Sequence, residues 1–211
     1  MKRYIRCEDE FLNYGDGDSR LHLAGDPNTD PSVLAELAKD YTSVIIREYV
    51  ARNPSTPVSA LKRLAKDGDE TVRSAVAFNK STPVDILNQL AKDWYMGVQS
   101  NVATNPNATS ETMDILAKSR PDWQTCQYVA ESPKTSTETL DVLSTLTPSH
   151  HLFDFYAKII TNPNTSLTAL TNILDTRDGE WLITKYSDRS DILDVISQRK
   201  QAKRSQRKRK A

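Results

Sequence analysis

The sequence predicts an all-α protein, a right-handed α-α superhelix (solenoid) of about six helix-pair repeats. A phrase that begins with Asn-x-Ser-Thr-Pro and ends with Leu-Ala-Lys-Asp recurs, with its clearest copies at residues 53–67 and 79–93. Its first position recurs every 26–30 residues, at Asp26, Asn53, Asn79, Asn105, Ser132 and Asn162. A period in this range indicates stacked supersecondary units.

The first helix of each repeat is expected to start at the Thr-Pro step and to run for about ten residues. Thr56 is expected to cap this helix in the second copy, with Pro57 at the first helical position. Thr135 opens a capping-box pattern, and Thr109 or Ser110 is expected to cap the copy between them. Apolar residues three apart predict the buried face: Leu34/Leu37, Leu61/Leu64, Leu87/Leu90, Met113/Leu116, Leu140/Leu143 and Leu170/Ile173.

A second, short helix is expected after a polar break such as residues 66–70. It should end at the Asn-Pro step, because the residue before proline is disfavoured in a helix. Apolar residues four apart predict its buried face: Ile46/Val50, Val72/Val76, Val98/Val102 and Phe155/Ile159. Helices this short are unstable alone in water, so each pair must bury its apolar face on the next pair.

The charge of the C-terminal tail differs from that of the rest of the chain. Residues 1–18 are expected to form an N-terminal cap, residues 19–197 the solenoid and residues 198–211 a disordered basic tail. From residue 199 onward the tail holds eight basic residues and no acid, which leaves 20 basic and 28 acidic residues in the rest. Such a tail favours nonspecific contact with nucleic acid or a solubilising role. The candidate nucleic-acid residues are Arg199, Lys200, Lys203, Arg204, Arg207, Lys208, Arg209 and Lys210.

Residues 50–79, VARNPSTPVSALKRLAKDGDETVRSAVAFN, resemble the leucine-rich repeat variant family. The resemblance extends over residues 19–175 and is sharpest over residues 46–118. It implies a right-handed array of alternating α-helices and shorter, often 3₁₀, helices. The period here is longer than the family's, which favours a fuller second α-helix of the kind found in HEAT-like pairs.

The founding type of the family carries an N-terminal cysteine cluster that holds an iron–sulfur centre. Only Cys7 lies in that region here, so neither this centre nor any other cofactor is expected. His150 and His151 lack the further ligands that a metal site needs. No metal is therefore expected.

An arginine recurs at one position of the second helix, as Arg20, Arg47 and Arg73, and Gln99 follows at the same position. Equivalent positions of a solenoid line one surface, so these residues could bind anions. The competing interpretation pairs each arginine with an aspartate of the preceding loop, such as Asp40 or Asp67.

Phe78 is a further binding candidate. Its equivalents in other repeats are polar, Arg52 among them, so this position is expected to face solvent. Aromatic residues also gather near the turns between helices, where they either anchor a partner or close the core: Tyr41, Trp94, Tyr95, Trp123 and Trp181.

These features favour a non-catalytic scaffold that binds a protein through its concave helical surface. The alternative is a nucleic-acid-binding protein that uses the tail and the arginines. A minor alternative is a HEAT-like DNA glycosylase, but no nucleophile–base arrangement is visible. The sequence has neither an apolar run long enough to span a membrane nor the pattern of a signal peptide, so a cytoplasmic protein is expected.

Overall fold

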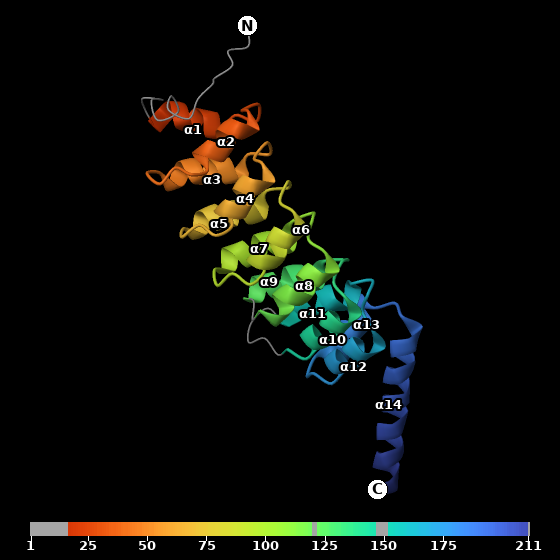
Figure 1. The fold of residues 1–211 in the computed structure, drawn as a ribbon. Helices are drawn as coiled ribbons and strands as arrows, with labels where there is room; N and C mark the ends of the chain where they lie inside the picture. Colours follow the sequence, from red (N-terminus) through yellow and green to blue (C-terminus); the bar gives the residue numbers. More distant parts are fainter. Residues whose placement is uncertain (1–16, 120–121, 147–151, 211) are drawn as a thin grey trace. The chain divides into compact units, whose positions relative to one another are not determined.

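The computed structural model describes residues 17–119, 122–146 and 152–210, where all regular structure is helical (Figure 1). The chain divides into two compact units, residues 1–108 and residues 109–211. The first unit contains α1 (Gly17–Gly25), α2 (Pro31–Leu37), α3 (Val44–Arg52), α4 (Val58–Leu64), α5 (Glu70–Phe78), α6 (Val84–Leu90) and α7 (Met96–Thr104). The second contains α8 (Ser110–Lys118), α9 (Trp123–Glu131), α10 (Thr137–Ser144), α11 (Leu152–Thr161), α12 (Leu167–Leu174), α13 (Gly179–Tyr186) and α14 (Ser190–Lys210).

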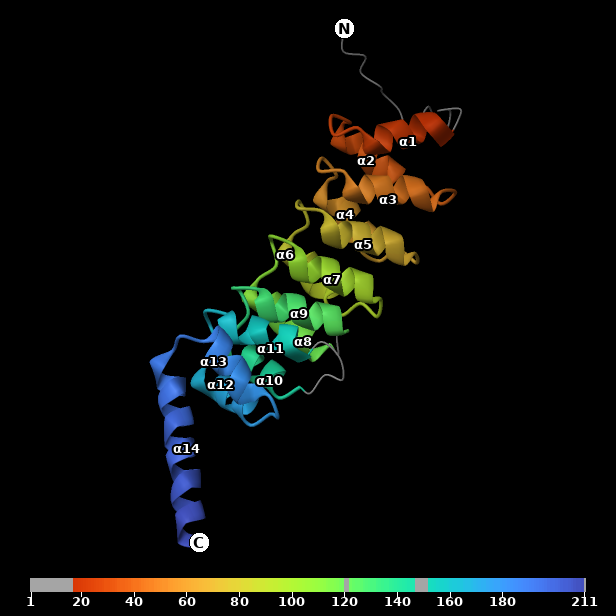
Figure 2. The same ribbon diagram turned by 180° about the vertical axis from the view of Figure 1, so that it is seen from behind.

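Each unit is a stack of helix pairs. In the first unit the second helices pack in succession, α1 on α3, α3 on α5 and α5 on α7, and Figure 2 shows them side by side. In the second unit α9 packs on α11 and α11 on α13, while the first helices α10 and α12 also pack together. The described helices α2 to α13 form six pairs, which confirms the predicted all-α helical repeat solenoid.

The core consists of the apolar positions that the repeat predicts. Every predicted pair of both helix types is buried, including Phe155 and Ile159 on α11. Small residues such as Ala51 and Ala77, which precede the Asn position, are buried as well. Alanine at this point lets neighbouring second helices approach closely.

The expected helix lengths are wrong in the first unit. The first helices α4 and α6 have seven residues, whereas the second helices α3, α5 and α7 have nine. After Leu64 the N–H groups of Lys66 and Asp67 bond to carbonyl oxygens three residues back, so the chain tightens into a turn. The expectation of a fuller second helix agrees with the structure.

The expected role of Thr56 is also wrong. Helix α4 begins at Val58 with Pro57 as its N-cap and has no side-chain cap. The Thr56 hydroxyl instead donates to the carbonyl oxygen of Val50 at 2.5 Å, and Thr82 does the same to Val76 at 2.6 Å. These threonines therefore satisfy free carbonyl groups at the end of the preceding second helix.

In the second unit the same threonine-to-carbonyl bond recurs, and the first helices also have side-chain N-caps. The hydroxyl of Thr135 donates to the carbonyl oxygen of Val129, and Ser136, in place of the predicted Thr135 box, caps α10. Thr109 caps α8 as predicted, in a capping box with Thr112.

The recurring Asn position does more than end a helix. The side-chain amide of Asn79 donates to the carbonyl oxygens of Ala51 and Asn53 in the previous repeat, at 2.7 and 2.9 Å. Its Oδ1 accepts the N–H of Ser81 at 2.8 Å. Equivalent bonds to the repeat before are made by Asn53, Asn105 and Asn162. This asparagine ladder joins successive repeats through their backbones.

Helix α14 differs from the expected disordered tail. It runs without interruption from Ser190 to Lys210, across the predicted boundary at residue 198. Ile192 and Ile196 are buried, and α14 packs on α12. Lysine, arginine, glutamine and alanine are all good helix formers, so the packed first half can propagate through the basic run. Residues 1–16, which include Cys7 and most of the predicted N-terminal cap, lie outside the described residues, as do His150 and His151.

Candidate interaction surface

The arginine row of the second helices is engaged in bonds between repeats. Arg47 pairs with Asp67, with Nε–Oδ2 at 2.7 Å and Nη2–Oδ1 at 3.0 Å, and its Nη1 donates to the carbonyl oxygen of Asp40 at 2.9 Å. The side-chain partner thus belongs to the loop of the following repeat. The preceding loop, which the competing interpretation had favoured, supplies only a backbone carbonyl.

The same arrangement recurs one repeat on. Arg73 makes two bonds to the carboxylate of Asp93, at 2.6 and 3.0 Å, and donates to the carbonyl oxygen of Asp67 at 2.9 Å. Arg20 makes a single bond to Asp40 at 2.7 Å. Gln99 has no charge, and its amide donates to the carbonyl oxygen of Asp93 at 2.7 Å.

Tyr156 of the second unit occupies the same register, six residues before the Asn position, and no sequence signal marks it as part of the row. Its hydroxyl donates to the carbonyl oxygen of Leu146 at 2.7 Å, as Gln99 does to its own loop. Burial raises the pKa of this phenol, so it stays a donor. The row is therefore a set of side chains that hold the loop between two helices.

The electrostatics of the row favour the paired state. Partial burial opposes ionisation of Asp67, but the hydrogen bonds from Arg47 and the Asp69 N–H outweigh it and hold the Asp67 pKa below its usual value. The carboxylate of Asp93 likewise raises the pKa of Arg73 through its hydrogen bonds. Because each guanidinium already has a carboxylate, little uncompensated charge remains in the row for an external anion.

The exposed candidates lie on the neighbouring face of the same helices. Phe78 on α5 is 55 % exposed, as its polar equivalents predict. The guanidinium carbon of Arg52, at the end of α3, lies 5.8 Å from the centre of the Phe78 ring, and Arg52 also pairs with Glu48 at 2.9 Å. This cation–π contact joins two successive repeats.

Two further residues complete this surface, and sequence reasoning missed both. Ile45 and Tyr49 on α3 are 57 % and 45 % exposed. They precede Arg52 by seven and three residues, a spacing that places all three on one face of the helix. We call Ile45, Tyr49, Arg52 and Phe78 the α3–α5 surface. Two apolar residues four apart on the second helix, outside the core register, were the signal available in the sequence.

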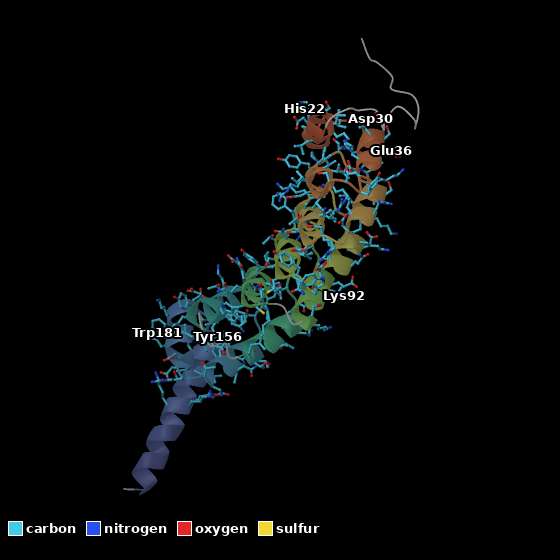
Figure 3. All side chains as sticks on the ribbon, turned by 90° about the vertical axis from the view of Figure 1, so that its left-hand side faces the viewer. His22, Asp30, Glu36, Lys92, Tyr156 and Trp181 are labelled. Carbon is cyan, nitrogen blue, oxygen red and sulfur yellow. The ribbon has the colours of Figure 1, made fainter. Side chains whose placement is uncertain are left out.

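A hollow of about 540 Å³ adjoins the α3–α5 surface at Tyr49. It lies where α1 and α3 pack, and Gly25 leaves it open, since a Cβ there would stand 3.1 Å from the Tyr49 ring. Figure 3 shows His22 on α1 at the opposite edge of the first unit from Asp30 and Glu36. The hollow thus lies on the second-helix side, lined by Asp18, Leu21, His22, Gly25, Asp26 and Tyr49.

The aromatic residues near the turns divide between the two interpretations. Tyr41 and Trp94 are largely exposed, and the Trp94 ring covers Arg73 at 5.7 Å. Trp123 is half-buried against Phe155, with ring centres 4.4 Å apart, and so helps to close the core.

Trp181, labelled in Figure 3, belongs to an exposed cluster of the second unit. It meets Phe153 edge to face at 5.8 Å, and the Lys185 ammonium lies 4.6 Å from its ring centre. Tyr95 is partly exposed and meets Trp94 edge to face at 5.9 Å.

The described residues offer no group of three or more metal-ligating side chains. Cys126 is buried, and burial together with the charge of Asp122 raises the pKa of its thiol to about 11. A thiol with such a pKa is a poor nucleophile at neutral pH. Among the described helices, none combines the length and the apolar character needed to cross a membrane.

The first two basic candidates on α14 form ion pairs with acids of the second unit. Arg199 pairs with Asp175, and Lys200 pairs with Glu180 at 2.6 Å. Both acids belong to the segment around α12 and α13. The other six basic residues follow along the helix to Lys210.

Comparison with known proteins identifies the first unit's repeats. Residues 18–80 match the family model of the Leucine Rich Repeat Variant domain. This segment is similar to the Leucine Rich Repeat Variant domain. The match covers a shorter stretch than the predicted resemblance, and later repeats depart from the pattern, with Ser132 at the Asn position and a 30-residue step after it. No curated protein and no solved structure matches the chain.

Proposed function

We propose that this chain is a non-catalytic scaffold that binds a protein partner on the α3–α5 surface. The observation that carries the proposal is the exposure of Ile45, Tyr49 and Phe78, three large apolar side chains on the adjacent packed helices α3 and α5. Ile45 and Tyr49 share one helix face with Arg52, and Arg52 contacts the Phe78 ring. Single exposed apolar residues are common on any protein, but several of them on one surface are typical of an interaction site. The hollow beside Tyr49 offers a recess for a partner's side chain.

Structural demands do not account for this patch. The buried positions of α3 and α5 hold the stack together, and the arginine row and the asparagine ladder join its repeats. The side chains of the α3–α5 surface belong to neither the arginine row nor the asparagine ladder, and Arg52 instead pairs with Glu48 and contacts the Phe78 ring. Aromatic residues beside an arginine are also the side chains most enriched among binding hot spots.

The test places a photo-crosslinking amino acid at position 78 of the full chain and captures partners from native extract. A matched probe at Lys62, exposed on the first helix α4, is the control. We expect a discrete crosslinked protein only from position 78. Its yield should fall at least tenfold in Tyr49→Ala and stay unchanged in Val58→Ala, which alters an exposed apolar residue of α4. Equal crosslinking from both positions, or a Tyr49→Ala variant that captures normally, would contradict the proposal.

A second candidate function is nucleic-acid binding through α14. Eight basic residues and no acid between residues 199 and 210 support it, since neutralised phosphates release counterions and so drive association. We propose it as an additional activity of the second unit. Retention on nucleic acid that falls with salt and is lost on deletion of residues 199–211 would support it. Undiminished retention without these residues would instead implicate Arg20, Arg47 and Arg73.

A further inference from the structure

The most informative unassigned feature is the second half of α14, residues 201–210, which overhangs its packing site. The first half is fixed by buried Ile192 and Ile196 against α12, and the ion pairs of Arg199 and Lys200 end this docked region. Figure 1 shows the dark blue α14 continuing beyond α12 and α13 to the C-terminus. Because α14 is one continuous helix, the axis of its docked half and the positions of residues around that axis continue unchanged into the overhang.

That register carries the packed face of α14 into a basic stripe. Successive residues of an α-helix are about 100° apart around its axis, so Lys203, Arg207 and Lys210 fall within about 60° of Ile192 and Ile196. The stripe that packs on α12 therefore continues past the end of α12 as a row of basic positions.

The other positions of the overhang are distributed unevenly as well. Five of its six basic residues fall within an arc of about 160° around the axis, with Arg209 the exception. The opposite arc contains the uncharged residues Gln201, Ala202, Ser205 and Gln206. The sequence alone shows a dense positive charge, whereas the helix places most of this charge on one side of its axis.

We infer that the overhang of α14 binds double-stranded DNA as a one-sided basic helix, an inference that rests on the second candidate function. The major groove of B-DNA admits an α-helix, and a basic arc of this width can meet the phosphates along its edges. Binding of single strands relies on aromatic stacking, and residues 190–210 include no aromatic residue. Duplex DNA should therefore be preferred over a single strand of equal length.

Two other polyanions fit the overhang less well. A membrane-surface helix needs a large apolar face opposite its basic face, and the uncharged arc offers only small and polar residues. An acidic protein surface would have to compete with the acids already near the root, where Asp175 and Glu180 neutralise Arg199 and Lys200. These acids also confine phosphate contacts to the overhang, because the docked half of α14 lies beside them.

The experiment compares the full chain with two variants of unchanged net charge. Ala202→Pro combined with Gln206→Pro breaks the helix at uncharged positions. The second variant spreads the charges around the axis through Gln201→Lys, Lys203→Gln, Gln206→Lys and Lys208→Gln, which leaves the six basic positions of the overhang about 60° apart with composition unchanged. Circular dichroism of each variant checks that the repeats remain folded. The probes are a 20-base-pair DNA duplex, its single strand, poly-glutamate and vesicles that contain phosphatidylserine.

We expect the full chain to bind the duplex with a log–log salt slope of about −4 to −5, as five phosphate contacts imply. Each variant should bind it about tenfold more weakly and lose the preference for duplex over single strand. Equal binding by the helix-broken variant would overturn the inference in favour of a flexible polycation, while nucleic-acid binding itself would stand. Tighter binding to vesicles or poly-glutamate than to the duplex would also overturn it. If the full chain binds no nucleic acid at all, the second candidate function fails together with the inference.

Discussion

Arg73 and Asp93 form a two-bond ion pair across adjacent repeats, with each side chain only 8 % exposed. The pair stands 20 residues apart in sequence, as do Arg47 and Asp67. Such a pair couples the end of one turn of the solenoid to the loop of the next. Removal of one partner leaves a buried charge unpaired, a change that typically costs about 3–5 kcal/mol.

The first prediction concerns stability in acid. Asp67 and Asp40 have folded pKa values below their ordinary ones: burial opposes ionisation, and hydrogen bonds from Arg47 and from Thr42, respectively, are the largest contributions that outweigh it. Such groups stabilise the fold above the unfolded value near 4, and this stability is lost as pH falls through the lower folded pKa. The melting temperature should fall below about pH 4, and Asp67→Asn should melt lower at pH 7 but show a smaller fall.

The control for this prediction is Glu36→Gln, which removes an exposed pair with Lys39. Exposed pairs contribute little, so its melting curve should follow that of the unchanged chain at each pH. Parallel pH profiles for Asp67→Asn and the unchanged chain would contradict the assigned role.

A second prediction concerns the core. Leu64 on α4 is 1 % exposed between adjacent helix pairs, so Leu64→Ala should destabilise the chain by about 2–5 kcal/mol in urea unfolding. Lys62→Ala, on the exposed side of the same helix, should change stability by less than about 0.5 kcal/mol. Similar effects from the two substitutions would mean that the register of the repeat is misplaced.

A third prediction concerns the asparagine ladder. Asn79→Ala leaves two buried carbonyl groups of the previous repeat without a donor, which should cost on the order of 2–4 kcal/mol. Asn107 also donates to two carbonyl groups, but it is exposed and water can replace it. Asn107→Ala should therefore cost about 1 kcal/mol or less in the same unfolding measurement. A larger loss at Asn107 than at Asn79 would refute the distinction.

The fourth prediction concerns thiol reactivity. Because burial raises the Cys126 pKa to about 11, this thiol stays protonated and inaccessible in the folded chain at pH 8. In a Cys7→Ser background, a thiol reagent should react slowly with the native protein and rapidly with one equivalent after denaturation. Rapid reaction of the native protein would show that α9 opens readily.

The core and the repeat were predictable because each depends on spacing. Leucines three apart and valines four apart can share one helix face in only one register, and all of them are buried as expected. The length of α4 was not predictable in this way, because its last turn is set by backbone bonds after Leu64. Thr56 was misjudged because a threonine before proline has two possible backbone partners, and local sequence does not distinguish them.

The candidate site was predictable in part. Phe78 stood out as an apolar residue in a polar column, and the structure exposes it. Ile45 and Tyr49 did not, because the only sequence signal that separates them from the core is their offset of one residue from the buried pair Ile46 and Val50. The partner of Arg47 lies in the next repeat, so the search within its own loop found a carbonyl where a carboxylate was expected. The helical tail escaped prediction because charge density alone suggested disorder.

The hydrogen bonds of the asparagine ladder all run in the same direction along the chain. Each donor belongs to the later repeat and each pair of acceptors to the earlier one, as Asn79 shows with Ala51 and Asn53. A repeat that leaves the ribosome therefore presents two carbonyl groups that only water can satisfy until the next asparagine has been synthesised. A stack cut short after a repeat that is normally followed by one of these asparagines would therefore leave two carbonyl groups without their donor, whereas the loss of an earlier repeat would leave an asparagine amide without its acceptors.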